Sequence, residues 1–316
     1  MTNDVRCRLP DRVANMTRLR RLSASGVSAL RDVAVVHGMA VVCMAFAAQA
    51  GAADAVRVAP AVIDGRGVHV HRVESTYQSG PTLIRVLLPC KQKTRLAVLY
   101  VLPVEPGTES RYGDALEEVL DHDLHNRYGL VCVLPTFSDL PWYADHASDP
   151  AIRQESYLLE AVLPFIERTY PVKRVAAGRL LVGFSKSGWG ALSLLLRYPD
   201  VFGKAAAWDA PLMLDEPGEY GTQPIFGTTE NFRRYQITRL LDQRAGAFRH
   251  GKRIILNGYA AFGHDHEQLH ERMTELGVSH VYRVSAADEH NWHSGWLPEA
   301  VALLMQTSTA SRRARK

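Results

Sequence analysis

Short runs of Val, Leu and Ile recur along the chain, and turn residues separate them. Many of these runs are apolar at nearly every position, as in strands that are buried on both faces of a sheet, and stretches with helical spacing lie between them. The predicted strands are residues 82–89, 95–103, 129–135, 179–184, 204–208, 253–258 and 280–285, and the predicted helices lie within residues 114–128, 152–170, 188–199 and 266–277. This alternation predicts an α/β protein with a mostly parallel central sheet and helices on both faces.

Two segments do not follow the alternation. Residues 56–80 have the pattern of antiparallel strands that lead into the sheet, and residues 212–250 form a long connection with several aromatic residues. A connection of that length in a compact domain is usually functional. Because the chain shows no internal repeat and no low-complexity linker, we expect one domain, from residue 53 to residue 308.

The first 52 residues have the layout of a secretory signal peptide. A basic stretch (MTRLRRLSASG) precedes an apolar run from Val33 to Ala48, and small residues follow that favour cleavage after Ala50 or Ala52. The apolar run is shorter than the about 20 residues that a membrane span needs, so an uncleaved membrane anchor is only the second interpretation. We expect residues 1–52 to be a leader, and the mature protein to be periplasmic or secreted.

Much of the excess of positive charge lies at the two ends of the chain. The formal net charge is +4, and many of the arginines lie within the first 31 residues or in a basic tail, residues 309–316. A nucleic-acid-binding protein needs a basic cluster within its folded region. The sequence shows no such cluster, so we expect no nucleic-acid partner.

Two of the four cysteines, Cys90 and Cys132, lie beyond the leader. An oxidising compartment would permit a disulfide between them. Cys132 lies inside an apolar strand pattern (LVCVLP), which favours a buried free thiol equally well. Both alternatives stay open at this point.

The stretch GFSKSGWGA, residues 183–191, is typical of a turn that exposes one serine. Ser185 follows a predicted strand and precedes a helix, which is the context of the G-x-S-x-G motif, although Ser187 replaces the last glycine. The backbone N–H groups at the start of that helix would stabilise a developing oxyanion. The alternative is that a crowded turn simply needs a small residue at this position.

The segment LLVGFSKSGWGALSLLLRYPDVFGKAAAWDAP resembles the serine turn of the putative-esterase family of α/β-hydrolases, which includes feruloyl esterases, S-formylglutathione hydrolases, enterochelin esterases and mycolyltransferases. YLLEAVLPFIERTYPV, LHERMTELGVSHVYRV and HNWHSGW are similar to further segments of that family, so the resemblance covers about residues 80–304. It implies the α/β-hydrolase fold and a catalytic serine, Ser185. It also implies that His290, which matches the family's terminal H-x-W, is the general base.

The sequence offers two candidates for the acid of the triad, Asp209 and Asp265. In the family it usually follows the penultimate strand, where this chain has Ala260 and Ala261. Asp265 lies a little further on, but with Gln268 it also has the pattern of a helix capping box. Asp209 directly follows the strand at 204–208 and has no evident cap or turn role. Since some α/β-hydrolases place the acid after that strand, we prefer Asp209 and keep Asp265 as the alternative.

The resemblance also assigns supporting roles. The N–H of Lys186 is one expected oxyanion donor, and the turn PVEP at residues 103–106 leaves only Val104 or Glu105 as the second, since proline has no N–H. Trp142 and Tyr143, in the loop TFSDLPWYADH, correspond to the substrate side, with the anchoring of that loop as the alternative. Trp292 is expected to shield His290 and to contact the substrate.

The stretch HEQLH, residues 266–270, also matches the zinc-binding motif H-E-x-x-H. Met273 and Leu276 stand where the extended form of that motif has its glycine and its third histidine, and the helix corresponds to an amphipathic helix of the esterases. We therefore expect no metal and no organic cofactor.

The sequence thus predicts an exported serine hydrolase that cleaves a small-molecule or carbohydrate-linked carboxylic ester through an acyl-enzyme on Ser185. An acyltransferase that uses the same serine is one alternative. A catalytically impaired binding protein on the same fold is the other, because the oxyanion turn and the acid position depart from the family.

Overall fold

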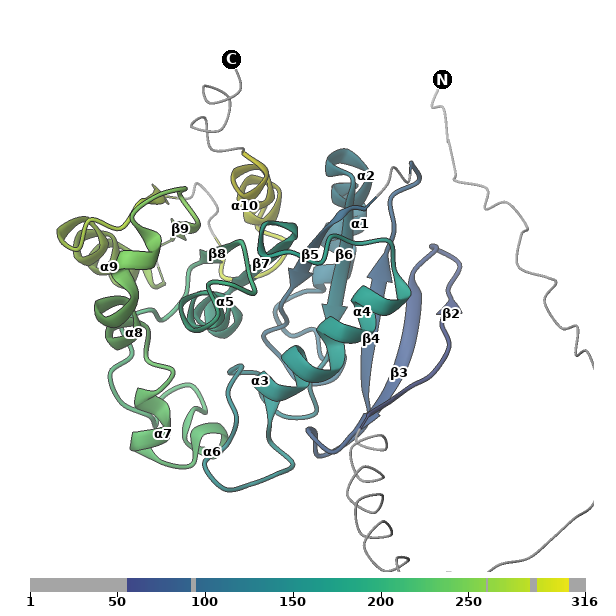
Figure 1. Cartoon of the computed structure of the whole chain (residues 1–316), viewed down its shortest axis with the longest axis horizontal. Coiled ribbons are helices and arrows are strands. Elements are labelled where there is room, and N and C mark those ends of the chain that lie inside the picture. Colours follow the sequence, from purple (N-terminus) through teal and green to yellow (C-terminus); the bar gives the residue numbers. More distant parts are fainter. Residues whose placement is uncertain (1–55, 92–94, 260, 285–288, 307–316) are drawn as a thin grey trace, which may run out of the picture. The chain divides into compact units, whose positions relative to one another are not determined.

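A computed structural model of the chain describes residues 56–91, 95–259, 261–284 and 289–306 (Figure 1). These residues fall within one compact unit. The predicted leader, its cleavage sites and the basic tail lie outside the described residues, so those predictions and the domain boundaries stay predictions. Within the described part of the chain, no helix is both long enough and apolar enough to cross a membrane.

Ten strands of the described chain form one mixed sheet, with the order β1-β3-β4-β6-β5-β7-β8-β9-β10 and with β2 paired to β3. Their bounds are Val56–Val58 (β1), Val62–Ile63 (β2), His69–Ser75 (β3), Thr82–Leu87 (β4), Ala97–Val101 (β5), Leu130–Pro135 (β6), Arg179–Phe184 (β7), Lys204–Trp208 (β8), Ile254–Gly258 (β9) and His280–Val284 (β10). The pairs from β1 to β4, and β4 with β6, are antiparallel, whereas β6, β5, β7, β8, β9 and β10 pair in parallel. The predicted mostly parallel sheet is therefore confirmed.

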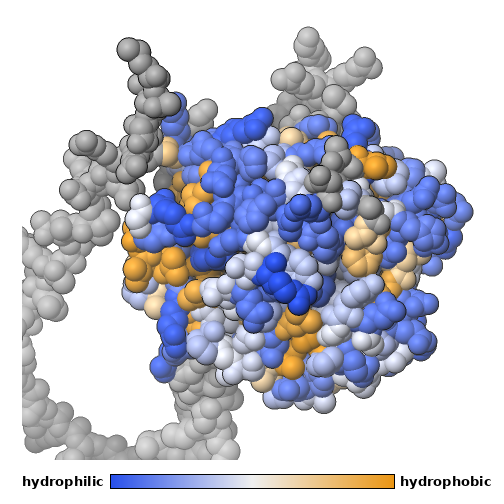
Figure 2. Space-filling model, turned by 180° about the vertical axis from the view of Figure 1, so that it is seen from behind, coloured by the Kyte–Doolittle hydropathy of each residue, from blue (hydrophilic) through white to orange (hydrophobic). Residues whose placement is uncertain are grey.

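Helices cover both faces of the sheet. One face carries α1 (Ala115–Asp121), α2 (Leu124–Tyr128) and α10 (Trp296–Met305), and the other carries α3 (Gln154–Ser156), α4 (Leu163–Thr169), α5 (Ser185–Arg197), α8 (Ile237–Arg244) and α9 (Gly263–Glu275). Figure 2 views the molecule from the side opposite to Figure 1, where the apolar surface is divided into separate small areas between polar ones. The buried residues form two hydrophobic cores, one between the sheet and the helices on each face.

Strand β8 shows how the sequence allows helices to pack on both faces. Its residues 205–207 are alanines, all buried, and Ala206 belongs to the core that contains α10, whereas Ala205 and Ala207 belong to the core that contains α5. Because alanine is small, both helices can lie close to the strand that ends at the candidate site.

The segment from α3 to α4 is continuous but not uniformly α-helical. Residues Tyr157–Val162 form a π-helical turn, and Pro164 stands at the start of α4. Proline has no N–H to donate to the carbonyl four residues earlier, so the regular hydrogen-bond pattern is interrupted at this place.

The connection predicted at residues 212–250 is largely helical. It contains α6 (Gln223–Phe226), α7 (Thr229–Arg233), α8 and a 3₁₀ turn, Ala245–Phe248. The aromatic residues of this segment are mostly buried: Phe226, Phe232 and Tyr235 pack beside Trp189 of α5, and Tyr220 is half exposed.

Cys132 is a buried free thiol in β6, so it does not form a disulfide with Cys90. Burial disfavours the thiolate and raises the pKa of Cys132 to about 12. Of the two alternatives for this residue, the structure has the buried thiol.

Candidate active site

The predicted site residues follow the carboxyl ends of three neighbouring parallel strands. The turn after β5 carries Val104, the turn after β7 carries Ser185, and the turn after β8 carries Asp209. The chain runs from β5 outward to β6 and then returns to β7 on the other side of β5. Such a reversal at the carboxyl ends of the strands is where α/β sheets bind ligands.

The turn after β7 holds Ser185 in an unusual backbone conformation. Its φ is 49°, in the left-handed region, which a residue with a side chain occupies only when the surroundings enforce it. The N–H of Ser185 donates to the carbonyl of Asp209 at 3.2 Å. A Cβ on Gly183 would lie 2.5 Å from atoms of Ser187, so this position requires glycine. The serine is therefore presented on a tight, fixed turn.

Ser187, the departure from the G-x-S-x-G motif, fastens this turn. Its hydroxyl is fully buried, accepts a hydrogen bond from the N–H of Phe184 at 3.0 Å and donates one to the carbonyl of Phe184 at 2.9 Å. A glycine could make neither bond. The side chain of Ser187 thus stabilises the backbone that positions Ser185.

His290 and Asp209 form a short hydrogen bond, with 2.6 Å between Nδ1 of His290 and Oδ2 of Asp209. The carboxylate is fully buried, and its other oxygen accepts from the N–H of Phe262 at 2.7 Å. A carboxylate only accepts hydrogen bonds, so Nδ1 carries the proton and Nε2 of His290 is the nitrogen free to take another. This arrangement prepares His290 to act as a base.

Aromatic rings fix the orientation of the His290 ring. The ring of Trp208 lies nearly parallel to it, with 6.2 Å between centroids, and the edges or faces of Phe184, Tyr112 and Phe262 contact it at 5.1–5.8 Å. Because Phe184 directly precedes Ser185, the imidazole lies beside the serine turn. No hydrogen bond joins the Ser185 hydroxyl to His290 in the described structure, and in hydrolases this bond often becomes well aligned only when substrate is present.

Asp265, the alternative acid, has a different partner. Its carboxylate accepts a hydrogen bond from the N–H of Met213 at 3.0 Å, and burial raises its pKa. The capping box that we predicted from Asp265 and Gln268 is wrong, because α9 begins at Gly263 and Asp265 lies inside its first turn. The structure brings Asp209, and not Asp265, to His290.

The turn after β5 leaves two backbone donors free. Val104 and Glu105 are buried, and within the described chain neither N–H group has an acceptor. Lys186 lies in the first turn of α5, where backbone N–H groups have no partner within the helix. These are the three groups that the sequence proposed as oxyanion donors, and they follow adjacent strands.

Trp142 and Tyr143 do not face a substrate. Both are fully buried, and their N–H groups donate to the side chain of Gln154 at 2.8 and 2.9 Å. Tyr143 packs so closely on α5 that a Cβ on Gly190 would lie 2.0 Å from its ring, and its hydroxyl donates to the carbonyl of Pro103. The substrate role predicted for both residues is therefore wrong, and Tyr143 instead supports the turn of Val104 from inside.

Trp292 is also buried, with 2% of its surface exposed. The predicted contact with substrate is therefore wrong, and its position agrees with the other predicted role, the shielding of His290. Its ring lies on Phe184, with 5.0 Å between centroids, and its N–H donates to the carbonyl of Tyr112 at 2.8 Å. Next to it, Nδ1 of His293 lies 2.7 Å from the buried carboxylate of Glu118 in α1. These contacts hold the loop that carries His290.

The sequence did not identify Tyr112 and Glu118 as residues that hold the loop of His290. That loop lies about 175 residues further along the chain, and nothing in a single sequence links it to them. Glu118 looked like one more polar residue of an amphipathic helix. A carboxylate buried beside His293 is visible only after the fold has brought both elements together.

The two histidines of HEQLH serve different parts of the protein. His266 is fully buried and its Nε2 accepts from the N–H of Ala210 at 2.9 Å, whereas His270 lies 2.7 Å from His280 and stacks on Tyr282. Among the described residues no group of three or more His, Cys, Asp or Glu is arranged to hold a metal ion. His266 thus holds the turn that follows Asp209.

His266 is expected to make folding stability depend on pH. Burial lowers its pKa from 6.5 to about 4, so below pH 6.5 the unfolded chain binds a proton that the folded chain does not. This contribution to the free energy of unfolding is present above pH 6.5 and should fall by about 3 kcal/mol as the pH drops to 4. Urea unfolding between pH 7 and 4 measures this loss of stability.

His266→Gln keeps an acceptor for the N–H of Ala210 and should flatten the dependence of stability on pH. The control is His264→Gln, at an exposed neighbouring position, which should leave that dependence unchanged. Identical pH dependence in the wild type and both variants would contradict the assignment to His266.

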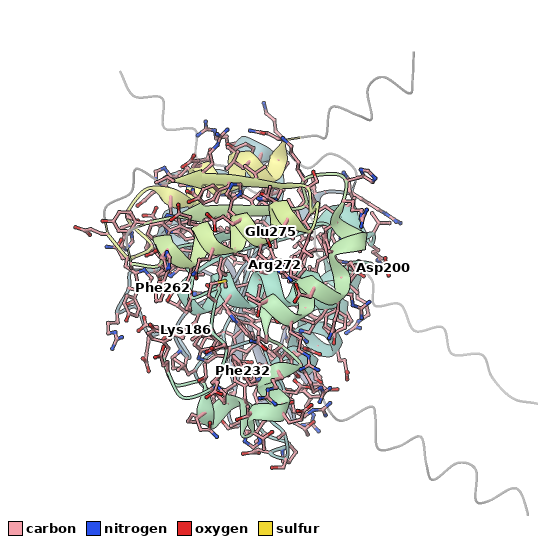
Figure 3. The ribbon with its side chains drawn as sticks, turned by 90° about the vertical axis from the view of Figure 1, so that its left-hand side faces the viewer. Lys186, Asp200, Phe232, Phe262, Arg272 and Glu275 are labelled. Atoms are coloured by element: carbon pink, nitrogen blue, oxygen red, sulfur yellow. The ribbon has the colours of Figure 1, made fainter. Side chains whose placement is uncertain are left out.

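A cavity of 470 Å³ adjoins the site. It is lined by Pro211, Met213, Leu214, Asp215, Glu216, Pro217, Gly218, Glu219, Tyr220, Phe262 and Asp265. Phe262 forms the boundary, because its ring contacts Tyr220 on the cavity side and His290 on the other. Phe262 and Lys186 lie toward the same side of the molecule in Figure 3, away from Asp200.

Comparison with known proteins agrees with this geometry. The family model described as putative esterase matches residues 138–257, which include the serine turn and Asp209. Over these residues the chain is similar to the putative-esterase family. Carboxylic ester hydrolysis is the class of reaction that this family description names. No curated protein matches the chain.

Solved structures confirm the α/β-hydrolase fold of the chain. An S-formylglutathione hydrolase from Agrobacterium tumefaciens has a TM-score of 0.63 at 15% identity and covers 79% of this chain and 98% of its own. A ferulic acid esterase has a TM-score of 0.58 at 18% identity, with 79% and 96% covered. FphF, a fluorophosphonate-binding serine hydrolase from Staphylococcus aureus, has a TM-score of 0.58 at 16% identity, with 80% and 98% covered.

Proposed function

We propose that this esterase is a serine hydrolase in which Ser185, His290 and Asp209 form the catalytic triad. The observation that carries the proposal is the 2.6 Å hydrogen bond between His290 and a buried Asp209, beside a serine held at a φ of 49°. The same turns supply free backbone N–H groups. Nucleophile, orienting acid and oxyanion donors thus follow neighbouring strands, and the loop before α10 adds the base, so the groups that acyl transfer requires lie together.

In the proposed mechanism the Ser185 hydroxyl attacks the ester carbonyl while Nε2 of His290 takes its proton. The negative charge then moves to the former carbonyl oxygen, where the N–H of Lys186 and that of Val104 or Glu105 stabilise it. His290 returns the proton to the departing alkoxide, which leaves an acyl group on Ser185. Water attacks this acyl-enzyme with the same proton transfers and releases the acid. Asp209 stabilises the imidazolium in both steps.

The 470 Å³ cavity beyond Phe262 is the proposed place for one part of the substrate. Its size suits a small-molecule ester or one sugar-linked group. Four carboxylates line it, Asp215, Glu216, Glu219 and Asp265, which disfavours substrates with a negative charge on that part. One structural neighbour is a ferulic acid esterase, which supports an ester of a small carboxylic acid without identifying it.

The competing function is a non-catalytic binding protein on this fold. It is favoured by the PVEP turn, in which Pro103 and Pro106 have no N–H to offer an oxyanion. The pair of buried Asp209 and His290 argues against a binding protein. A purely structural pair would not need a histidine whose Nε2 stays free. An acyltransferase would use the same acyl-enzyme and differs only in the second nucleophile.

Labelling with a fluorophosphonate probe tests the proposal. We expect one equivalent of probe on the wild-type protein, located by peptide mass spectrometry on Ser185, because only an activated serine reacts. Ser185→Ala should lose the label, and Ser110→Ala, an exposed serine in the loop that borders the site, should keep it. An unlabelled wild-type protein would favour the binding protein.

We also propose that the protein is exported, on the basis of the basic and apolar segments of residues 1–52. The intact-mass spectrum of labelled protein recovered from the cell envelope reports its N-terminus as well. That N-terminus is expected near Gly51 or Ala53. Full-length protein recovered from the cytoplasm would contradict export.

A further inference from the structure

A second cavity, of 310 Å³, lies among α5, α7 and α8. It is lined by Arg197, Glu230, Arg233, Arg234, Arg239, Leu240, Gln243 and Arg244. Helices α7 and α8 face the viewer in Figure 3, near the label of Phe232. The sequence predicted no basic cluster within the folded region. This prediction is wrong, because the arginines of residues 233–244 and Arg197 line one cavity.

The lining is strongly positive. It contains five guanidinium groups and one carboxylate, that of Glu230. Arg233, Arg239 and Arg244 are exposed, and none of them has an ion-pair partner among the described residues. The acidic residue of α8, Asp242, is already paired with Arg272 of α9 at 2.8 Å. Among the described residues, no ion pair therefore neutralises the positive charges of Arg233, Arg239 and Arg244.

Arg197 forms the floor of this cavity. It pairs with Glu155, and its guanidinium lies over the ring of Tyr235, 4.3 Å from the centroid. Burial lowers its pKa to about 10, so it stays charged at neutral pH. Arg234 lies near the same ring, 6.0 Å from the centroid. Two of the five arginines are thus held in place by aromatic packing, which reduces the entropy lost when they bind a ligand.

Helix electrostatics account for only part of the cluster. Arg197, Arg233 and Arg244 lie in the last turns of their helices, where a cation stabilises the helix dipole. Arg239 is the third residue of α8, in the first turn, where the helix dipole disfavours a cation. Its position beside the others brings like charges together, which costs free energy unless an anion occupies the cavity.

We propose that this cavity binds a phosphate-bearing ligand. Arginine is the residue that recognises phosphate through paired hydrogen bonds, and a phosphate monoester or diphosphate carries two or three negative charges, which match this lining better than one carboxylate does. The cavity lies at the C-terminal end of α5, whereas Ser185 begins that helix, about 18 Å away along its axis. The site is therefore separate from the proposed esterase site and goes beyond that function.

Calorimetric titration of the full chain with pyrophosphate tests the proposal. We expect saturable one-to-one binding that weakens as salt rises, and about tenfold or greater loss of affinity in Arg239→Ala and in Arg244→Ala. Arg168→Ala is the matched control, because Arg168 is also exposed in the last turn of a helix, α4, but lines neither cavity. Its affinity for pyrophosphate should equal that of the wild type, and melting temperatures verify that all variants fold.

Sedimentation with phosphatidic acid vesicles distinguishes two sources of the phosphate. Vesicle binding that pyrophosphate displaces and that Arg239→Ala weakens supports the site with a lipid headgroup as ligand. Pyrophosphate binding without vesicle binding supports a soluble ligand. Absence of both, or an equal loss of affinity in Arg168→Ala, would overturn the proposal. None of these measurements depends on ester hydrolysis, so they stand or fall independently of the catalytic assignment.

Discussion

Replacement of Ser185 by alanine is expected to lower kcat for a short p-nitrophenyl ester by about 10⁶-fold, and His290→Ala should lower it by a similar factor. The serine supplies the bond to the acyl group, and the histidine supplies the proton transfer without which that serine is a weak nucleophile. The two residues act as a unit, so the double variant should be no slower than either single variant. Initial rates with each purified protein measure the effect.

Ser187→Ala is the matched control, two residues further along the same turn. Its hydroxyl makes both hydrogen bonds with the backbone of Phe184, so its loss should cost about 1–2 kcal/mol of stability. The nucleophile is untouched, and we expect kcat to change far less than in Ser185→Ala. Wild-type activity in Ser185→Ala, or a collapse of kcat in Ser187→Ala with an unchanged fold, would exclude Ser185 as the nucleophile.

The sheet could be predicted because strands buried on both faces appear in the sequence as runs of apolar residues. Residues Leu130–Pro135 are all buried, and the predicted and observed bounds of that strand differ by one residue. The helix Trp296–Met305 was missed as an element, because it is apolar nearly all round and shows little helical periodicity.

The direction of a side chain is what the sequence could not provide. Trp142 and Tyr143 follow a strand end, where ligands bind, and aromatic residues occur both in binding sites and in cores. Only the fold shows that Tyr143 packs against Gly190 and that Gln154 holds both backbone N–H groups. The basic cavity was missed for the same reason: four of its five arginines lie within residues 233–244, but only the fold shows that their side chains line one cavity together with Arg197.

Asp209 could be proposed from the sequence because it had no local role. Asp265 remained an alternative because its apparent capping box was equally consistent with a catalytic position. The structure gives Asp265 a third role, in which its carboxylate fixes Met213 at the rim of the acidic cavity. A single sequence does not contain that contact, because the partner is a backbone N–H in a distant loop.

Asp209→Asn is expected to keep the fold and to lower kcat by about 10⁴-fold. The amide oxygen of asparagine can still accept from the N–H of Phe262, so the buried turn keeps its main bond. The carboxylate that stabilises the imidazolium is lost, and an amide N–H facing Nδ1 would favour the tautomer in which Nε2 cannot accept a proton from Ser185.

Asp265→Asn is the control for this prediction, because an amide oxygen there can still accept from Met213 and no contact with His290 is lost. We expect its kcat and melting temperature to stay close to those of the wild type. The measurement is kcat and melting temperature for both variants and the wild type. A collapse of kcat in Asp265→Asn with normal activity in Asp209→Asn would reverse the assignment of the acid. If neither variant lost activity, Ser185 and His290 would work without a carboxylate, and the 2.6 Å bond between Asp209 and His290 would serve only to position the ring.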